Sequence, residues 1–452
     1  MQAAMTNDNA EMTVIVGLGV SGSACLRYLH ARGYQLAVMD TRQSPPGLDQ
    51  ARRLLPEHAL LMGGLDANCL HRAARVVLSP GVSLQTPAVA AAAAAGVPVI
   101  GELELFAEAV NAPVIAVTGS NGKSTVTSLV GQMLQAAGLD VAVGGNLGTP
   151  ALDLLRDAPA PDAYVLELSS FQLETVNALK PVASVVLNVS EDHLDRHHSL
   201  DAYAHIKSRI FRGNGLMVLN RDDALVRRMA IRGRRTVWFG KSAPRSVDDY
   251  GLLETDNDCW LFRGDERLVA LSEMQLQGRH NLLNGAAAIA LATDLGAPIA
   301  VCLEVLRQFR GLPHRMELVA RHAGVAWIND SKATNVGATA AAVAGIPGSL
   351  ILIAGGEGKG QDFQPLAAAL TNKVRAVVLM GRDATLIEAA VSGRVPTESA
   401  ASLDAAVRIA SQLAAPGDTV LLSPACASFD MFRNFEDRGD QFRRLVLAEG
   451  EA

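Results

Sequence analysis

Two glycine-rich loops, each standing between an apolar run and a helical pattern, constrain the fold of this chain most strongly. The first, Gly17–Gly22 (GLGVSG), follows the apolar run Val14–Val16, and the second, Gly119–Thr125 (GSNGKST), follows Val114–Thr118. A strand that leads through such a loop into a helix is the repeating unit of α/β domains. Further apolar runs without polar alternation predict buried parallel strands, at Thr13–Val16, Val114–Val117, Val185–Leu187, Leu350–Ala354 and Thr419–Leu422. The chain is therefore predicted to be an α/β protein.

The length of the chain and two breaks in its pattern predict three domains. A chain of 452 residues corresponds to two to four domains of about 100–200 residues each. One break, near Gly101–Ala112, precedes the second glycine loop, and the other, Arg310–Pro313, separates a helical stretch from another αβ series. We predict domains at residues 1–102, 103–311 and 312–452.

Composition excludes several classes of protein. The net charge is −6 and no long basic run occurs, so neither nucleic acid nor an anionic membrane is expected as the main partner. The most apolar stretch, Ala88–Ile100, is shorter than the ~20 residues that span a bilayer, which predicts no membrane insertion. The N-terminus lacks the pattern of a signal peptide, and five scattered cysteines without a CxxC pair favour reduced thiols. These features predict a cytoplasmic protein, which we expect to be a monomer.

The first glycine loop has three interpretations. Its glycines allow a diphosphate to approach the backbone, and the following helix N-terminus favours negative charge. A second strand, Gln35–Met39, ends at Asp40, as in dinucleotide-binding domains, which would indicate an NAD-dependent oxidoreductase. The loop could also be a tight turn that binds nothing, or it could bind another nucleotide that carries a diphosphate.

The second glycine loop predicts a triphosphate site. Backbone N–H groups of such a loop hold phosphate oxygens, Lys123 would reach the β- and γ-phosphates, and the Ser124 hydroxyl would ligate Mg²⁺. The spacing G-x-x-G-K-S is shorter than that of the general P-loop. A loop of this composition that arose by chance is the alternative.

Five further side chains have both a functional and an ordinary interpretation. Glu167 and His193 each follow an apolar run, so they are expected at the carboxyl ends of parallel strands, where they would meet at a metal. Because Mg²⁺ prefers oxygen ligands, a structural hydrogen bond is the alternative for His193. Lys207 is either an exposed lysine or, beside Ile206 and Ile210, a partly buried one. Two asparagines three residues apart, Asn281 and Asn284, would face one ligand or cap a helix.

Motifs along the whole chain resemble the Mur ligase family. After TGSNGKST they occur in the order LELSSFQLE, NVSEDHLDR, GRHNLLN, LPHRME, NDSKATN, GGEGKG and SPACASFDMFRNFEDRG. NDSKATN and the last motif are similar to the members that add D-glutamate. The resemblance implies an N-terminal Rossmann-like domain for UDP, a central P-loop ATPase domain and a C-terminal Rossmann-like domain for the amino acid. It also implies an ATP- and Mg²⁺-dependent amide-bond-forming ligase of peptidoglycan precursor synthesis, which joins D-glutamate to UDP-N-acetylmuramoyl-L-alanine through an acyl phosphate.

The resemblance further assigns residues to each ligand. The UDP-sugar would contact Val20, Ser21, Asp40, Thr41, Arg42, Ser79, Gly81 and Asn146. ATP would contact Gly119, Ser120, Asn121, Gly122, Lys123, Ser124, Thr125, Asn281, Asn284, Arg315 and Asp330. D-Glutamate would contact Lys332, Thr334, Lys359, Ser428 and Phe435. The metal would be held by Ser124, Glu167, His193 and Lys207, the last as a carbamate, and the catalytic residues would be Lys123, His193, Lys207 and Arg315.

The sequence departs from the family pattern at two positions. Glu357 stands where aspartate is more usual, and Phe429 stands where leucine is common; both would alter only the edge of the amino-acid pocket. Three other functions stay open at this point: a glutamate ligase with another acceptor or with L-glutamate, an NAD-dependent oxidoreductase, and a nucleotide switch that forms no product.

Overall fold

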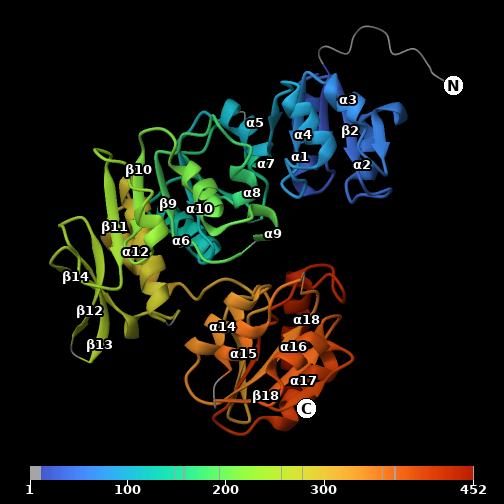
Figure 1. Cartoon of the computed structure of the whole chain (residues 1–452). Coiled ribbons are helices and arrows are strands. Elements are labelled where there is room, and N and C mark those ends of the chain that lie inside the picture. Colours follow the sequence, from blue (N-terminus) through green and yellow to red (C-terminus); the bar gives the residue numbers. More distant parts are fainter. Residues whose placement is uncertain are drawn as a thin grey trace. The chain divides into compact units, whose positions relative to one another are not determined.

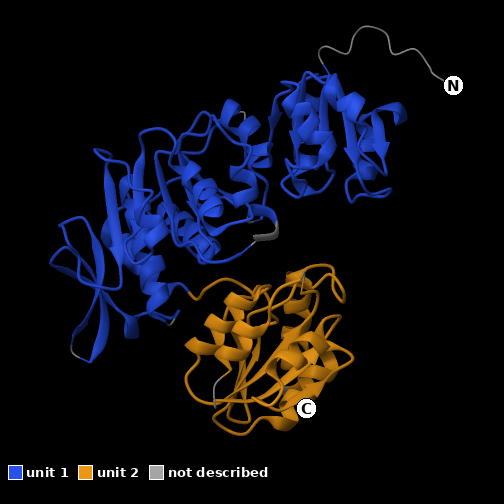
Figure 2. Ribbon diagram, viewed as in Figure 1, with its two compact units in different colours: residues 1–309 blue, residues 310–452 orange. Residues whose placement is uncertain are grey.

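A computed structural model describes residues 12–146, 148–155, 158–192, 194–255, 257–276, 278–358, 360–370 and 373–450 (Figure 1). The chain forms two compact units, residues 1–309 and 310–452 (Figure 2). The first unit contains two sheets and the second contains one. In the described part of the chain, no helix is both long and apolar enough to cross a membrane. The α/β fold is confirmed, whereas the boundaries 1–102, 103–311 and 312–452 stay predictions.

The first sheet is parallel throughout, in the order β3-β2-β1-β4-β5. Its strands are β1 Thr13–Val16, β2 Leu36–Asp40, β3 Leu60–Met62, β4 Arg75–Leu78 and β5 Val99–Ile100. The helices are α1 Val20–Ala31, α2 Leu48–Leu54, α3 Ala67–His71, α4 Pro87–Ala94 and α5 Glu102–Ala109, with a 3₁₀ turn at Glu57–Ala59. The strand order reverses between β1 and β4, and ligands of such sheets bind beyond the carboxyl ends of the strands at this switch point.

The second sheet has the order β14-β13-β12-β11-β10-β9-β6-β8-β7. Its strands are β6 Val114–Thr118, β7 Val141–Gly145, β8 Ala163–Glu167, β9 Ala183–Val186, β10 Leu216–Asn220, β11 Thr236–Gly240, β12 Tyr250–Thr255, β13 Asp258–Arg263 and β14 Glu266–Ala270. Its helices are α6 Lys123–Ala136, α7 Ala151–Leu154, α8 Ser170–Leu173, α9 Leu194–His197, α10 Leu200–Ser208, α11 Ala224–Arg227, α12 Arg279–Asp294 and α13 Ile299–Gln308, with 3₁₀ turns at Arg209–Phe211 and Leu271–Glu273. Strands β6 to β12 pair in parallel, and β12 to β14 form an antiparallel extension.

The second unit is built on one sheet in the order β15-β16-β20-β17-β18-β19. Its strands are β15 Glu317–His322, β16 Val325–Asn329, β17 Leu350–Gly355, β18 Val374–Met380, β19 Thr397–Ser399 and β20 Thr419–Leu422. Its helices are α14 Val336–Gly345, α15 Gln364–Ala369, α16 Ala384–Val391, α17 Leu403–Leu413 and α18 Phe435–Gly450. All pairs are parallel except β15 with β16. Apolar layers cover both faces of the sheet, around Leu352 on one face and Ile353 on the other.

Candidate active site

The first glycine loop lies at the switch point of the first sheet. Gly17 has a φ of +89°, and a Cβ on Gly22 would lie 1.9 Å from the Gly17 carbonyl oxygen, so both positions require glycine. Ser79, which follows β4, donates its hydroxyl to that same carbonyl at 2.7 Å. The loop and Ser79 thus meet where a diphosphate would bind, with the first turn of α1 beside them.

Asp40 supports this loop from the end of β2. Its carboxylate accepts the N–H of Leu18 at 2.7 Å and the Nε of Arg42 at 2.9 Å. Burial opposes ionisation of the carboxyl, but the hydrogen bonds from Arg42 and Leu18 outweigh it and lower the pKa of Asp40 to about 2. Val20, Thr41, Arg42 and Gly81 are exposed at the same end of the sheet.

Two lysines converge on the second glycine loop. Lys123, the first residue of α6, donates its Nζ to the carbonyls of Gly119 and Ser120, both at 2.9 Å. Lys207, from α10, donates to the same Gly119 carbonyl at 2.9 Å. Two lysine Nζ atoms thus meet on one carbonyl of the loop, and the charge of Lys123 suits the binding of a triphosphate.

Lys207 is almost completely buried, with 1% of its surface exposed, so the interpretation as an exposed lysine is wrong. Burial and the charge of Lys123 hold its pKa well below the usual lysine value, while Asp192 and Glu167 oppose the shift. Its Nζ also lies 4.3 Å from the centre of the Tyr203 ring. A lysine in these surroundings has a neutral amine available far more often than one in water.

Glu167 ends β8 beside the loop and is also buried. Its Oε1 accepts the side-chain amide of Asn146 at 2.6 Å, and its Oε2 has no hydrogen-bond partner among the described residues. Asn146 therefore follows β7 of the second sheet, whereas the other residues predicted for the UDP-sugar belong to the segments of the first sheet. A buried carboxylate oxygen without a protein partner is suited to bind a cation.

The two asparagines of α12 lie together next to the loop. The Asn284 amide donates to the Asn281 carbonyl oxygen at 3.2 Å. A Cβ on Gly122 would lie 2.7 Å from the side-chain oxygen of Asn284, so the helix packs directly on the phosphate loop. Ser124 and Thr125 are buried in the first turn of α6.

In the second unit, Asp330 follows β16 and is held by Ser423. The Ser423 hydroxyl donates to the Asp330 carboxylate at 2.8 Å, and the N–H of Met316 donates at 3.2 Å. Burial raises the pKa of Asp330 to about 7, and the Ser423 hydrogen bond and the charge of Arg315 limit the rise. Arg315 itself stands between His314 and Met316, which both have positive φ values.

The segments that carry the residues predicted for D-glutamate meet in this unit. The Lys332 Nζ lies 4.4 Å from the centre of the Phe435 ring, and Ser428 is buried in the loop after β20. Thr334 follows Lys332 in the loop after β16, where its N–H donates to the Lys332 carbonyl at 2.8 Å. The loop after β17, which leads to Lys359, pairs with the loop after β20 through Glu357.

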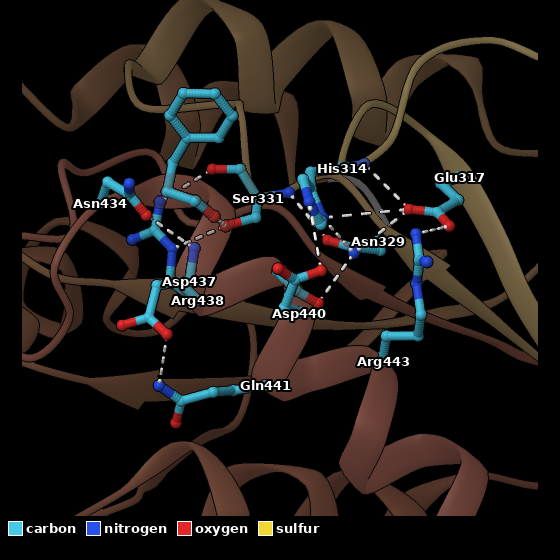
Figure 3. Close-up of polar contacts among 12 residues, drawn as sticks. His314, Glu317, Asn329, Ser331, Asn434, Asp437, Arg438, Asp440, Gln441 and Arg443 are labelled. Carbon is cyan, nitrogen blue, oxygen red and sulfur yellow. Dashed lines mark hydrogen bonds and ion pairs between the residues drawn. The ribbon is translucent and has the colours of Figure 1, made fainter.

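Arg438 joins these segments, and its role was missed from the sequence (Figure 3). Its guanidinium donates to the Ser331 hydroxyl at 2.9 Å, to the Ser331 carbonyl at 2.8 Å and to the Cys426 carbonyl at 3.2 Å. The Ser331 hydroxyl in turn donates to the Phe435 carbonyl at 2.8 Å. Arg438 is completely buried, and burial lowers its pKa to about 10. One guanidinium thus fixes the residues adjoining Lys332, Ser428 and Phe435.

His314 forms a second anchor beside Arg438 (Figure 3). It lies within 2.9 Å of the Asn329 amide and 3.6 Å of the Asp440 carboxylate. A Cβ on Gly439 would lie 2.2 Å from its ring, so α18 can approach only with glycine there. This contact holds the backbone on the N-terminal side of Arg315. Two predicted site residues, His193 and Lys359, lie outside the described residues.

Comparison with known proteins identifies the class to which this fold and these loops belong. Three family descriptions match: Mur ligase MurD-like, N-terminal domain, at residues 11–101; Mur ligase middle domain at 117–292; and Mur ligase, glutamate ligase domain, at 314–426. The chain belongs to the Mur ligase family. The prediction of this family, with its three domains, is confirmed.

Individual proteins of the family show which of its members the chain is similar to. The chain is 53% identical, over 97% of its length and 96% of the relative, to UDP-N-acetylmuramoylalanine–D-glutamate ligase of Nitrosococcus oceani. It is 51% identical to the enzyme of the same name from Marinobacter nauticus, over 96% of this chain and 97% of the relative. Among solved structures, UDP-N-acetylmuramate-alanine ligase from Thermotoga maritima matches with a TM-score of 0.61 at 20% identity, over 97% of this chain and 99% of that one. A pseudomurein peptide ligase type C from Methanothermus fervidus matches with a TM-score of 0.61 at 19% identity, over 97% and 100%; these two likenesses concern the fold alone.

Proposed function

We propose that this enzyme joins D-glutamate to UDP-N-acetylmuramoyl-L-alanine with hydrolysis of ATP, in the synthesis of peptidoglycan precursors. The name of relatives about half identical over the whole length supports the substrates. The convergence of Lys123 and Lys207 on the Gly119 carbonyl is the structural observation that carries the ATP-dependent step. The reaction takes place in the cytoplasm, which is consistent with the free, buried cysteines of the described chain, and the enzyme acts as a monomer.

The chemistry requires activation of a carboxylate. A free carboxylate does not acylate an amine at neutral pH, because its oxide is a poor leaving group and its charge repels nucleophiles. Transfer of a phosphoryl group from ATP to the L-alanyl carboxylate forms an acyl phosphate, and the amine of D-glutamate then displaces phosphate. Lys123 and Arg315 offset negative charge on the transferring group. The D-glutamate ammonium must first lose a proton, for which His193 is the proposed base.

The residues around Glu167 fit Mg²⁺, which would neutralise charge on the transferring phosphate when bound. The Ser124 hydroxyl, the partnerless Oε2 of Glu167, His193 and a modified Lys207 would hold it. The described residues contain no group of three or more His, Cys, Asp or Glu side chains placed for a metal. Of the proposed ligands, Glu167 is the only described residue of these four types, because His193 lies outside the described residues.

Lys207 is proposed to carry that carbamate. Its neutral amine adds to CO₂ with loss of one proton, which converts a cationic side chain into a carboxylate on a long stem. The lowered pKa of the buried amine favours the addition, because only the neutral amine reacts. The product supplies the hard oxygen ligand that Mg²⁺ prefers.

The amino-acid site is proposed in the second unit. D-Glutamate carries two carboxylates, for which Lys332, Lys359 and the hydroxyls of Ser428 and Thr334 are suitable partners. Exclusion of water from the site would protect the hydrolysable acyl phosphate.

The test is incubation with ATP, Mg²⁺, UDP-N-acetylmuramoyl-L-alanine and either enantiomer of glutamate, with product mass and phosphate release measured. One phosphate per product, with D-glutamate only, is expected. Equal use of L-glutamate would instead favour the alternative of a ligase that accepts L-glutamate. Absence of ATP hydrolysis upon addition of both substrates would refute the proposal and revive the oxidoreductase interpretation.

A further inference from the structure

The β4 turn, residues Ser79–Val82, carries residues proposed for the UDP-sugar and is fixed at both of its ends. At its first end, the Ser79 hydroxyl donates to the carbonyl of Gly17 in the first glycine loop. Within the turn, the N–H of Val82 donates back to the Ser79 carbonyl at 2.9 Å. At its second end, the Val82 carbonyl accepts a hydrogen bond from the Arg196 guanidinium at 3.1 Å. Arg196 therefore holds the end of the turn that the glycine loop does not hold.

Arg196 reaches this turn from a helix associated with the other sheet of the unit. It lies in α9, in the segment between β9 and β10 of the second sheet, whereas β4 belongs to the first sheet. A second contact joins the same two segments, because the side-chain amide of Gln85 lies 3.0 Å from Nε2 of His198. The residues proposed for the UDP-sugar also come from segments of both sheets, since Asn146 follows β7. Contacts between these segments therefore bear on the binding of this one ligand.

An ion pair orients the Arg196 guanidinium toward the turn. The Nη2 atom that donates to the Val82 carbonyl also lies 2.6 Å from the Glu174 carboxylate. Both charged side chains are largely buried. The carbon at the centre of the guanidinium lies 5.0 Å from the centre of the Phe171 ring, within the range of a cation–π contact. A short charge-assisted bond and a ring contact together give the guanidinium a defined orientation.

Glu174 is in turn held by a short, capped helix. It follows α8, where the Ser169 N–H donates to the Gln172 side chain at 3.0 Å and the Gln172 N–H donates to the Ser169 hydroxyl at 3.2 Å. The Glu174 carboxylate also lies 3.4 Å from Nδ1 of His197. Helix α8 comes directly after β8, which ends at Glu167. The Arg196–Glu174 pair thus ties the β4 turn to the segment that carries a proposed metal ligand.

We propose that Arg196 is a positioning residue for the UDP-sugar, which holds the β4 turn in its binding conformation through the Val82 carbonyl. The inference rests on the proposed function, since it takes this turn to contact the UDP-sugar. Without the guanidinium, one end of the turn loses its donor and only a fraction of the molecules keeps the conformation that binds. The apparent affinity falls in proportion to that fraction. Loss of a hydrogen bond from a charged donor corresponds to a decrease of about ten-fold or more.

The test combines three measurements on the full chain. Calorimetric titration with UDP-N-acetylmuramoyl-L-alanine in the absence of ATP should show binding about ten-fold weaker in Arg196→Met. Hydrogen exchange of the peptide that contains Val82, measured without ligand, should be faster in this variant. In steady-state kinetics, the KM for the UDP-sugar should rise while the KM for D-glutamate stays unchanged.

Arg27→Met is the matched control for attachment of the two sheets in general. Arg27 also joins segments of both sheets, because it pairs with Asp153 of α7 at 2.5 Å, but it does so from α1 rather than at the β4 turn. UDP-sugar affinity and exchange at Val82 should therefore stay close to wild type in Arg27→Met.

A double variant separates the position of the turn from the stability of the ion pair. Arg196→Met leaves the buried Glu174 carboxylate without the guanidinium, which is destabilising in itself. Arg196→Met combined with Glu174→Gln removes that charge, so it should melt closer to wild type yet bind the UDP-sugar as weakly as Arg196→Met. This double variant replaces the single one if Arg196→Met does not fold.

Three results would overturn the proposal. They are wild-type affinity and exchange in Arg196→Met, recovery of affinity in the double variant, and equal losses in Arg196→Met and Arg27→Met. A wild-type protein that does not bind the UDP-sugar would instead refute the proposed function, while exchange at Val82 would still show whether Arg196 holds the turn.

Discussion

Replacement of Arg438 by lysine tests whether one buried guanidinium fixes the amino-acid site. Arginine reaches Ser331 and Cys426 together because its nitrogens form a planar fork. Lysine retains the charge but presents a single nitrogen, which cannot serve both segments. Arg438→Lys should therefore lower the affinity for D-glutamate and the stability of residues 310–452.

The size of the effect follows from the contacts that are lost. Each hydrogen bond from a charged donor contributes about 1.5–3 kcal/mol, and a buried carbonyl left without a donor adds its own cost. Loss of two of the contacts corresponds to about 3–6 kcal/mol, a large part of the ~5–15 kcal/mol that stabilises a typical domain. The unfolding midpoint of this unit should fall by roughly 10 °C. The KM for D-glutamate should rise at least about ten-fold, while the KM for the UDP-sugar stays unchanged.

The assay combines thermal unfolding with steady-state kinetics in which each substrate is varied in turn. Arg433→Lys is the control, because Arg433 is exposed and contacts only Asp437 among the described residues, with the charge preserved. Added guanidinium ion should partly restore the D-glutamate KM of Arg438→Ala and leave Arg433→Ala unaffected. An Arg438→Lys enzyme with a wild-type melting curve and a wild-type KM for D-glutamate would refute the reasoning.

The other predictions concern four residues of the two units. Lys123→Ala should reduce phosphate release by at least about 10²-fold and leave UDP-sugar binding intact; turnover at the wild-type rate would remove the ATP-loop assignment. Lys207→Ala should lose nearly all activity and regain part of it with millimolar acetate, while Lys207→Arg should regain little; full activity without acetate would exclude the carbamate. Lys359→Ala should mainly raise the KM for D-glutamate, by the ~1.5–3 kcal/mol of a charged hydrogen bond; a change confined to the KM for ATP would place Lys359 elsewhere. Burial raises the pKa of Asp330 to about 7, so above pH ~4 the folded state keeps a proton that the unfolded state has released. The free energy of unfolding should therefore fall between pH ~4 and 7. Denaturant unfolding of Asp330→Asn should lack this fall, and a pH profile identical to that of wild type would refute the shift.

Local sequence patterns predicted the parallel strands and the glycine loops well. The expected strand Thr13–Val16 coincides with β1, and Thr419–Leu422 coincides with β20. Apolar runs bounded by glycine are sufficient here, because each strand is buried on both faces. For Lys207, local spacing left two alternatives open, and the structure favours the buried one that Ile206 and Ile210 indicated.

Features that depend on the order of strands in a sheet could not be predicted from local sequence patterns. The hydrogen bond between the Asn146 and Glu167 side chains exists because β7 and β8 are neighbours in the sheet. A local sequence pattern does not indicate which strands are neighbours. The antiparallel extension β12 to β14 was missed, although Gly264 in the turn between β13 and β14 has a positive φ and marks a reversal.

The role of Arg438 was missed for a different reason. The motif that contains Arg438 indicates the family, but Arg438, Phe442 and Val446 also recur every four residues on one face of α18. All three are completely buried. A charged residue such as Arg438 on an otherwise apolar face of a helix predicts a buried polar network rather than an exposed ion pair.

The place of β20 in its sheet has a consequence for the order in which the protein acquires structure during synthesis. This strand, Thr419–Leu422, stands between β16 and β17 and pairs with both, although β16 precedes it by about ninety residues. The first sheet, by contrast, is complete once residue Ile100 has been made. On the ribosome, the N-terminal sheet can therefore fold early. The sheet of residues 310–452 must wait until Leu422 has been made. Termination before β20 would leave the facing edges of β16 and β17 unpaired and prone to aggregation.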